Sequence, residues 1–379
     1  MKKIVALLLA LAMTLSMAAF AGAEEAVTLK IAHIGPLTGA AAVYGVATSR
    51  GAQIAAEEIN AAGGKYKIEI IDEDDTHDAE KAVNAYNDAM DKGAQMIIGT
   101  TTTTPCIAVG ALANEERVFM LTPSASSDGV PAIGDNVFQI CFTDSTQGTK
   151  AADYIKEHSV GTKIGIIYNN AQDYSIGIYN SFKAQAAVLG LEIVAEKAYS
   201  DDNASDFSAQ VNAMKDAGAD LVFIPIYYTP AYKILAYAKS IDYAPVFFGV
   251  DGMDGILDME NLDTAVVEGL MYLTPFAPNS SDERSQAFAN KYREMFGIDA
   301  IQFAADEYDA VYVLKELCEK AGITADTPAD EACEKLIAAI TDGYTYEGIT
   351  GTMTWDANGT VTKEPKAAQI LDGKYVMAE

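Results

Sequence analysis

Two neighbouring segments of the chain decide its fold: Gln95-Met-Ile-Ile-Gly-Thr-Thr-Thr-Thr-Thr-Pro105 and Val118-Phe-Met-Leu-Thr-Pro-Ser-Ala-Ser-Ser-Asp128. In each, a short apolar run typical of a buried strand ends in small hydroxylated residues. Ligands of open α/β sheets bind just outside the carboxyl ends of such strands. Two adjacent strands ending this way would surround one small polar group with hydroxyls and backbone N–H donors. A Ser-rich turn and a solvated Thr loop are the alternatives, so the rest of the chain has to decide.

Strand and helix patterns alternate outward from these segments. Strands are expected at 28–35 and 67–72, and helices at 46–62, 79–91 and 105–115. Thr104 would cap the last of these helices, and Pro105 suits its first turn. Alternation at this spacing predicts an α/β fold, in which a parallel sheet carries helices on both faces.

The pattern restarts in the second half of the chain. After a strand at 137–142, strands are expected at 163–168, 191–198, 221–226 and 246–251, with helices at 174–189, 207–217 and 229–241 between them. The segments 92–99 and 217–224 resemble each other, and each leads through a helix to a Val-Phe strand. Two similar α/β lobes are the economical interpretation. The rest is rich in helix, at 282–296, 303–321 and 330–341, before a strand and turn at 351–359 and a last strand at 368–376.

The first 23 residues have the pattern of a secretory signal. A basic start, Met1-Lys-Lys, precedes the apolar run 4–20 and the small residues Ala21-Gly-Ala23. The alternative, a membrane anchor, has no need of those small residues, and no cysteine supports a lipid anchor. We therefore expect an exported protein, in the periplasm or, without an outer membrane, at the extracellular face.

Composition narrows the function further. The net charge is −28, and it becomes −28 − 2 = −30 once the two signal lysines are removed, so phosphate backbones would be repelled. A hydrophobic fraction of 50% and 20 tyrosines argue against a disordered acidic chain. The 379 − 23 = 356 mature residues exceed one comfortable core, which predicts two domains. Nucleic acid is therefore not an expected partner.

Cofactor and metal motifs are not found in the sequence. The dinucleotide, P-loop and nucleophile-elbow patterns do not occur. The acidic run 72–78 follows a strand, where a solvated loop tip is favoured over the alternative of a metal site. The segment Asp251-Gly-Met-Asp-Gly255 lacks the alternating acidic ligands of a calcium loop, but Asp251 follows a buried strand and could either cap the next turn or contact a ligand. The three histidines are scattered. Four cysteines in an exported chain could pair as Cys318 with Cys333 and Cys106 with Cys141, the latter two otherwise being buried thiols.

Several short motifs, in order, carry a resemblance. They are Ile34-Gly-Pro-Leu-Thr-Gly39 with Tyr44-Gly45, Ile59-Asn-Ala-Ala-Gly-Gly64, Ile98 to Thr104, Thr122-Pro-Ser-Ala-Ser126, Asp144-Ser-Thr-Gln-Gly148, Asp251 to Gly255 and Tyr308-Asp-Ala310. From about residue 29 onward, the chain resembles the periplasmic branched-chain amino-acid (Leu/Ile/Val) binding proteins of ABC transporters, which have the type I periplasmic-binding fold.

The resemblance implies a ligand site divided between two lobes. Its residues would be Tyr44, Thr102, Thr103, Ser124, Ala125, Ser126, Tyr174, Tyr227, Asp251 and Phe303. Thr102 and Thr103 match the hydroxyl pair that holds the ligand α-carboxylate, and 124–126 matches the strip that meets both ligand charges. Asp251 matches the partner of the α-ammonium. The aromatic residues match wall positions, with Tyr228 as an alternative to Tyr227.

The resemblance also implies the domain arrangement. Lobe 1 would comprise 27–142 and 275–353, and lobe 2 would comprise 143–274 and 354–379, with three crossings as a hinge. Ligand between the lobes would favour closure, and a membrane permease would then receive it. Asp306 and Glu307 share a helical face with Phe303. We expect both to be solvated, although either could serve a polar ligand if it reached the cleft.

These observations predict a monomeric receptor for a small aliphatic amino acid, without enzymatic activity or cofactor. Amide, aromatic-acid, sugar or other small polar ligands remain alternatives within the same fold, as does a sensory role without transport. An α/β hydrolase that uses Ser124 or Asp251 is the competing class.

Overall fold

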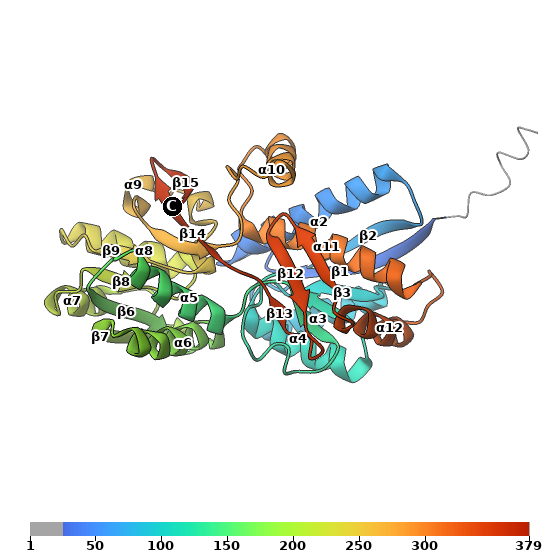
Figure 1. Cartoon of the computed structure of the whole chain (residues 1–379), viewed down its shortest axis with the longest axis horizontal. Coiled ribbons are helices and arrows are strands. Elements are labelled where there is room, and N and C mark those ends of the chain that lie inside the picture. The colour runs from blue at the N-terminus through green and yellow to red at the C-terminus, as the bar shows by residue number, and fades with distance from the viewer. Residues whose placement is uncertain (1–25, 379) are drawn as a thin grey trace, which may run out of the picture.

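The computed structural model describes residues 26–378, so the predicted signal at 1–23 lies outside the described residues. Two α/β units lie side by side along the long axis of the molecule (Figure 1). We call the unit that contains β1 (Val27–Gly35) lobe 1 and the unit that contains β6 (Lys163–Asn169) lobe 2. The predicted fold class, with helices flanking parallel sheets, is confirmed.

Lobe 1 is built on a parallel sheet with the strand order β2-β1-β3-β4-β5. The strands after β1 are β2 (Tyr66–Asp74), β3 (Met96–Gly99), β4 (Met120–Thr122) and β5 (Val137–Gln139). Strands β3 to β5 are buried at every residue, as expected for short parallel strands covered on both faces. The order reverses between β1 and β3, so the loops that follow these strands open at a switch point where ligands bind in such sheets.

Five helices cover this sheet. They are α2 (Ala42–Ala62), α3 (Ala79–Asp91), α4 (Thr103–Glu116), α11 (Gln302–Ala321) and α12 (Ala329–Thr341). Helices α3 and α4 share one core with Ile34 and Met120, and α2, α11 and α12 share another with Leu29 and Phe119. Alternate side chains of a strand point to opposite faces, which is why neighbouring residues of β4 belong to different cores.

Lobe 2 repeats this strand order as β7-β6-β8-β9-β10. Its strands are β7 (Glu192–Tyr199), β8 (Leu221–Phe223), β9 (Val246–Phe248) and β10 (Met271–Thr274), joined by antiparallel β14 (Lys366–Leu371) and β15 (Lys374–Met377). Its helices are α5 (Asp144–Glu157), α6 (Asp173–Leu189), α7 (Ser208–Asp216), α8 (Tyr228–Ser240) and α9 (Thr264–Val267), with short 3-10 turns η1 (Asp201–Asn203), η2 (Asp251–Met253) and η3 (Ile256–Asp258). The shared order agrees with two similar lobes.

The last crossing between the lobes lies later in the chain than predicted. After α10 (Glu283–Phe296) and the helices of lobe 1, strands β11 (Thr345–Gly348), β12 (Gly351–Trp355) and β13 (Val361–Thr362) form a small antiparallel sheet. Trp355 is fully buried in a lobe 1 core, and its Nε1 donates to the Gln139 carbonyl at 2.9 Å. Because β13 pairs with β12, the boundary at 353/354 is wrong, and the chain crosses to lobe 2 between β13 and β14.

The two lobes meet along a common apolar seam. Tyr44, Ala47 and Ile54 of α2 share one core with residues of α8, η3 and α10.

Within lobe 1, helix α11 lies so close to α2 that a Cβ on Gly51 would be 2.1 Å from the Ala304 carbonyl oxygen. The absence of a side chain at Gly51 therefore permits this helix contact.

All four cysteines are buried free thiols. The predicted pairing of Cys318 with Cys333 is wrong, because the Cys318 thiol instead lies 3.8 Å from the Met96 sulfur. The pairing of Cys106 with Cys141 is also wrong, and the alternative of two buried thiols is the one observed. Cys106 lies in the core between α4 and the sheet, whereas Cys141 lies on the segment between β5 and α5.

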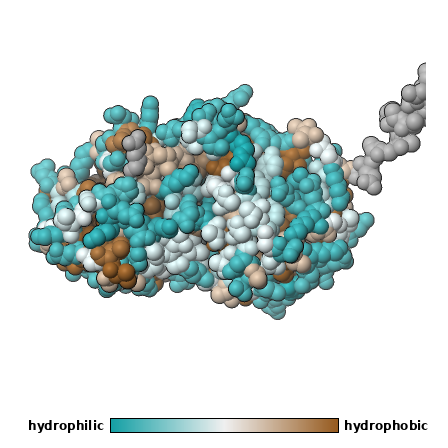
Figure 2. All heavy atoms as spheres, viewed as in Figure 1, coloured by the Kyte–Doolittle hydropathy of each residue, from teal (hydrophilic) through white to brown (hydrophobic). Residues whose placement is uncertain are grey.

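The surface is largely polar on the face seen in Figure 2, where hydrophobic residues form small separate patches. Large apolar side chains that are exposed within 26–378 are Val188, Ile298 and Leu371. Over the same residues, no helix combines the length and apolar character required to cross a bilayer.

Candidate ligand site

The two hydroxyl-rich loops lie side by side in lobe 1, as their positions after adjacent strands predict. Thr122 Oγ1 donates to the Thr100 carbonyl at 2.7 Å, and Ser124 Oγ donates to the Thr101 carbonyl at 2.7 Å. These bonds fasten the loop after β4 to the loop after β3. The two loops therefore form one cradle at the carboxyl edge of the sheet.

The cradle hydroxyls are not equally available to a ligand. Ser124 already donates its hydroxyl proton to the Thr101 carbonyl, and Ser126 Oγ donates to Asp144 Oδ1 at 2.7 Å. Thr102 Oγ1 lies 2.9 Å from His77 Nδ1, and no described residue hydrogen-bonds to the Thr103 hydroxyl. A ligand carboxylate would therefore meet free donors first at Thr103, and the serines would have to exchange partners.

The start of α4 adds backbone donors to this edge. The helix begins at Thr103 with Thr102 at the N-cap position, two residues earlier than predicted, and Thr104 is an exposed residue of its first turn. Thr102 makes no side-chain cap because its hydroxyl faces His77. The first N–H groups of the helix thus lack a side-chain acceptor, and such a terminus favours an anion.

Lobe 2 supplies a buried carboxylate. Asp251 is 4% exposed, and its Oδ1 accepts a hydrogen bond from Tyr174 Oη at 2.5 Å. Burial raises the pKa of Asp251 to about 7, and contacts with Tyr174 and Gln147 oppose this rise only in part. Within residues 26–378 this carboxylate forms no ion pair, although buried charges are normally paired. Its position suits a cationic group from outside the chain.

Gln147 connects this carboxylate to the cradle. Its Oε1 accepts the Asp251 backbone N–H at 3.1 Å, and its Nε2 donates to Ser126 Oγ at 3.2 Å. The motif 144–148 is recognisable in the sequence, but nothing in it predicts the contacts of Gln147 with Ser126 and Asp251. The contact of His77 with Thr102 is likewise not predictable, because the two residues are 25 positions apart.

Four aromatic residues predicted as walls meet around Asp251. The rings of Tyr174 and Tyr227 stack at 4.7 Å with an interplanar angle of 5°. Tyr44 lies 5.7 Å from Tyr227 and 4.3 Å from Phe303, measured between ring centroids. Tyr228, the alternative to Tyr227, instead donates its hydroxyl to the Ala40 carbonyl at 2.8 Å. Tyr227 is thus the ring next to Tyr174.

Comparison with known proteins places this arrangement in a family. A family model for periplasmic binding proteins matches residues 28–374. The chain belongs to the periplasmic binding protein family. Among curated relatives, the Leu/Ile/Val-binding protein homolog 3 of Brucella melitensis is 28% identical over 349 residues, which cover 90% of this chain and 91% of the relative. The leucine-, isoleucine-, valine-, threonine- and alanine-binding protein of Pseudomonas aeruginosa is 28% identical over 338 residues and covers 88% of this chain and 87% of its own.

Solved structures agree with the periplasmic binding protein fold. A leucine-binding protein from Thermotoga maritima has a TM-score of 0.82 and 26% identity, covering 93% of this chain and 98% of its own. A branched-chain amino-acid transporter substrate-binding protein from Streptococcus pneumoniae, solved with isoleucine, has the same score and identity and covers 93% and 100%. A benzoate complex of a solute-binding protein from R. palustris, at 19% identity and a TM-score of 0.81 over 92% and 95% of the two chains, shares the fold. The predicted resemblance is confirmed.

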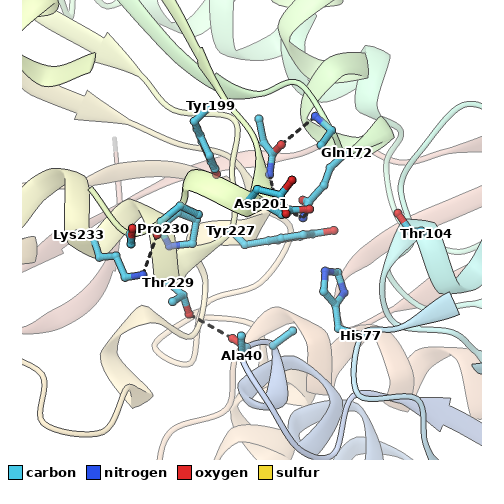
Figure 3. A pocket seen from close by; sticks show the side chains of 16 residues that line it. Ala40, His77, Thr104, Gln172, Tyr199, Asp201, Tyr227, Thr229, Pro230 and Lys233 are labelled. Carbon is cyan, nitrogen blue, oxygen red and sulfur yellow. Dashed lines mark hydrogen bonds between the residues drawn. The ribbon is translucent and has the colours of Figure 1, made fainter. Parts of the chain in front are cut away.

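A cavity of about 620 Å³ opens between the lobes of this periplasmic binding protein (Figure 3). His77 and Thr104 line it from lobe 1, opposite Tyr199, Asp201 and Lys233 from lobe 2. Tyr227 is the one predicted site residue in its lining, and its ring points toward the space between Thr104 and His77. The same ring stacks on Tyr174, whose hydroxyl binds Asp251, so Tyr227 links the cavity to this pair.

Asp306 and Glu307 are buried, so the prediction that both are solvated is wrong. Asp306 Oδ1 lies 2.5 Å from Lys363 Nζ, in an ion pair with both side chains almost inaccessible. Lys363 also donates to Thr350 Oγ1 at 2.7 Å. Glu307 has no hydrogen-bond partner at either oxygen within the described chain, and burial raises its pKa well above the usual range. Lys363 belongs to the last crossing, which explains why the helical pattern alone could not locate the pair.

The acidic run 72–78, at the end of β2 and in the loop that follows, binds neighbouring strands, loops and helix ends. Asp74 accepts the N–H groups of Leu37 at 2.9 Å and Thr76 at 2.8 Å, and Asp78 accepts that of Lys81 at the start of α3. Among residues 26–378, no cluster of three histidine, cysteine or acidic residues is arranged to hold a metal ion. These carboxylates fix the loop that presents His77 to Thr102.

Proposed function

We propose that this chain is an exported receptor that captures a small amino acid, branched-chain or otherwise aliphatic, between its lobes and delivers it to an ABC permease. One observation carries the proposal. A buried, unpaired Asp251 in lobe 2 is joined through Gln147 to a cradle in lobe 1 that offers hydroxyl and helix-terminus donors. The two sides have opposite polarity, as a zwitterion requires.

The energetics are consistent with this ligand class. A zwitterion loses hydration on enclosure, so each charge needs a partner. Hydrogen bonds to charged groups contribute roughly 1.5–3 kcal/mol each, and burying an aliphatic side chain contributes about 1.5–3 kcal/mol. A micromolar dissociation constant needs about 8 kcal/mol net. The cradle, Asp251 and the rings of Tyr44 and Phe303 are enough to reach that range.

Other features support the remaining parts of the proposal. The relatives are named for leucine, isoleucine and valine binding, and one solved neighbour holds isoleucine. The amino-terminal pattern at 1–23 supports export, and the net charge of −28 disfavours nucleic acid. We propose a monomer that binds without enzymatic turnover, because Ser124 donates its hydroxyl proton to a backbone carbonyl rather than to a base.

Thermal melting against the twenty amino acids tests the proposal. Ligand at about 100 times its dissociation constant adds about 2.7 kcal/mol to the free energy of unfolding, which is about 3–4 °C for a chain of this length. We expect shifts with leucine, isoleucine or valine. A shift with benzoate or 4-hydroxybenzoate and with no amino acid would replace the proposal by the aromatic-acid alternative, because such ligands lack the ammonium group that Asp251 would pair.

A further inference from the structure

The first turn of α11 is capped from the opposite lobe. Helix α11 packs on α2 in lobe 1, and its N-cap residue Ile301 supplies no side-chain cap. The acceptor is instead Asp254, in the turn after η2 of lobe 2, whose Oδ2 accepts the Gln302 backbone N–H at 2.8 Å. Asp254 is 2% exposed, and its Oδ1 accepts the Gly255 N–H at 3.1 Å. A carboxylate at a helix amino terminus is favoured by the helix dipole.

The Gln302 side chain returns a bond across the same boundary. Its Nε2 donates to the Asp251 carbonyl at 3.0 Å, and the residue is 1% exposed. The backbone of Asp251 is thus held by α11, whereas its carboxylate is held by Tyr174 within lobe 2. Phe303, the next residue of α11, packs its ring 4.3 Å from Tyr44. The bonds from Gln302 to Asp254 and to the Asp251 carbonyl therefore fix the distance between the Asp251 carboxylate and the ring of Phe303.

A third contact at this turn crosses between the lobes. Tyr44 Oη donates to the Gly252 carbonyl at 2.6 Å. All three bonds join residues 251–254 of lobe 2 to side chains or backbone of lobe 1, so separation of the lobes breaks them together. A separated α11 would have to satisfy its first N–H with water, because the chain before it offers no side-chain cap.

We propose that Asp254 and Gln302 are positioning residues, whose cross-lobe bonds set Asp251 against Phe303 as the lobes close and so couple ligand capture to closure. The inference rests on the proposed function for the identity of the ligand, but the geometry of closure can be measured without any ligand. Asp254 acts through Gln302 and does not itself need to touch the ligand.

The test combines leucine binding with the distance between the lobes. Spin labels at Asn87→Cys on α3 and Val188→Cys on α6 report that distance, because both positions are exposed and lie on different lobes. We expect Asp254→Ala to weaken leucine binding by more than tenfold and to lengthen the distance in the ligand-free protein. Asp254→Asn keeps an oxygen that can accept the Gln302 N–H. Its leucine affinity and its ligand-free distance between the lobes should therefore be close to those of wild type. Gln302→Ala should disturb folding less than Asp254→Ala does. It should also weaken leucine binding and lengthen the distance between the lobes.

Asp282→Ala is the matched control. Asp282 also caps a helix, since its Oδ2 accepts the Ser285 N–H of α10 at 2.8 Å, but both partners lie on the same side of the hinge. Its loss should change leucine affinity less than twofold and leave the distance unchanged. Wild-type affinity and distance in both Asp254→Ala and Gln302→Ala would overturn the inference. If the wild-type protein binds no amino acid, the proposed function fails, and the ligand-free distances alone decide the coupling.

Discussion

Replacing Asp251 by asparagine should weaken ligand binding and stabilise the free protein. Asparagine has nearly the same shape, and its side-chain oxygen can still accept the Tyr174 hydroxyl that now lies 2.5 Å from Asp251 Oδ1. The substitution therefore removes a charge with little change in packing. Because that charge is buried without a partner in the described chain, its loss should have opposite effects on stability and on affinity.

The effect on stability follows from the pKa. Burial raises the pKa of Asp251 from its ordinary 3.8 to about 7, so the ionised form is disfavoured in the folded state. Three pH units correspond to about 4 kcal/mol as an upper bound. The cost is complete above pH 7 and disappears as the pH falls toward 4, so Asp251→Asn should gain about 1–4 kcal/mol at pH 8 and almost nothing at pH 4.

The effect on affinity has the other sign. An ammonium buried without its carboxylate costs about 2–5 kcal/mol, which corresponds to roughly 30-fold to several-thousand-fold weaker binding. Because Asp251 must lose its proton to pair, wild-type affinity should fall about tenfold between pH 8 and pH 6. Asp254, with a pKa of about 7, and Asp306, at about 6, titrate in the same range. They are present in both proteins, so the difference between the proteins isolates Asp251.

Titration calorimetry with leucine at pH 8, 7 and 6 measures the affinities, and urea unfolding of the free proteins at pH 8 and 4 measures the stabilities. A variant that binds leucine within threefold of wild type at pH 8 would refute the pairing of Asp251 with the ammonium. A variant that is less stable than wild type at pH 8 would refute the cost assigned to the buried charge.

Three further substitutions test the interior away from Asp251. Lys363→Met leaves the Asp306 carboxylate buried without its partner and should cost about 3–5 kcal/mol in urea unfolding at pH 7; a loss under about 1 kcal/mol would contradict the role of this pair. Gly51→Ala places a methyl group 2.1 Å from the Ala304 carbonyl oxygen and should lower the free energy of unfolding by about 1–3 kcal/mol; unchanged thermal melting would show that the helices separate freely. Glu307→Gln removes an unpartnered carboxyl whose pKa burial raises above its ordinary 4.5, so the stability advantage of the variant over wild type should grow as the pH rises above that ordinary value. Parallel stability curves from pH 5 to 8 would contradict that assignment.

Much of the fold follows from local patterns in the sequence. The strands before Thr100 and Pro123 are continuous apolar runs because both faces of a parallel sheet are covered. Since the carboxyl ends of adjacent parallel strands share one edge, the cradle formed by Thr100 to Thr103 and Ser124 to Ser126 was predictable, and so was the place of Asp251 after a buried strand.

The unpredicted parts depend on partners far along the chain. The helical pattern placed Asp306 beside Phe303 but could not show that Lys363, 57 residues later, would cover it. His77 reaches Thr102 only because Asp74 and its neighbours turn the acidic loop. The same contact occupies the Thr102 hydroxyl, so Thr102 stands at the N-cap position of α4 without forming a side-chain cap. Local sequence contains the strands and turns, but not these long-range bonds.

The position of Trp355 has a practical consequence for optical experiments. It is the only tryptophan in the chain, and its indole N–H is bound to the carbonyl of Gln139, the last residue of β5, shortly before the chain first leaves lobe 1. Indole emission from the unlabelled protein therefore arises from a single buried site beside the hinge. Gln139 also donates through Nε2 to the Ala125 carbonyl of the cradle at 2.7 Å, so intrinsic fluorescence reports on the cradle and the neighbouring crossing together.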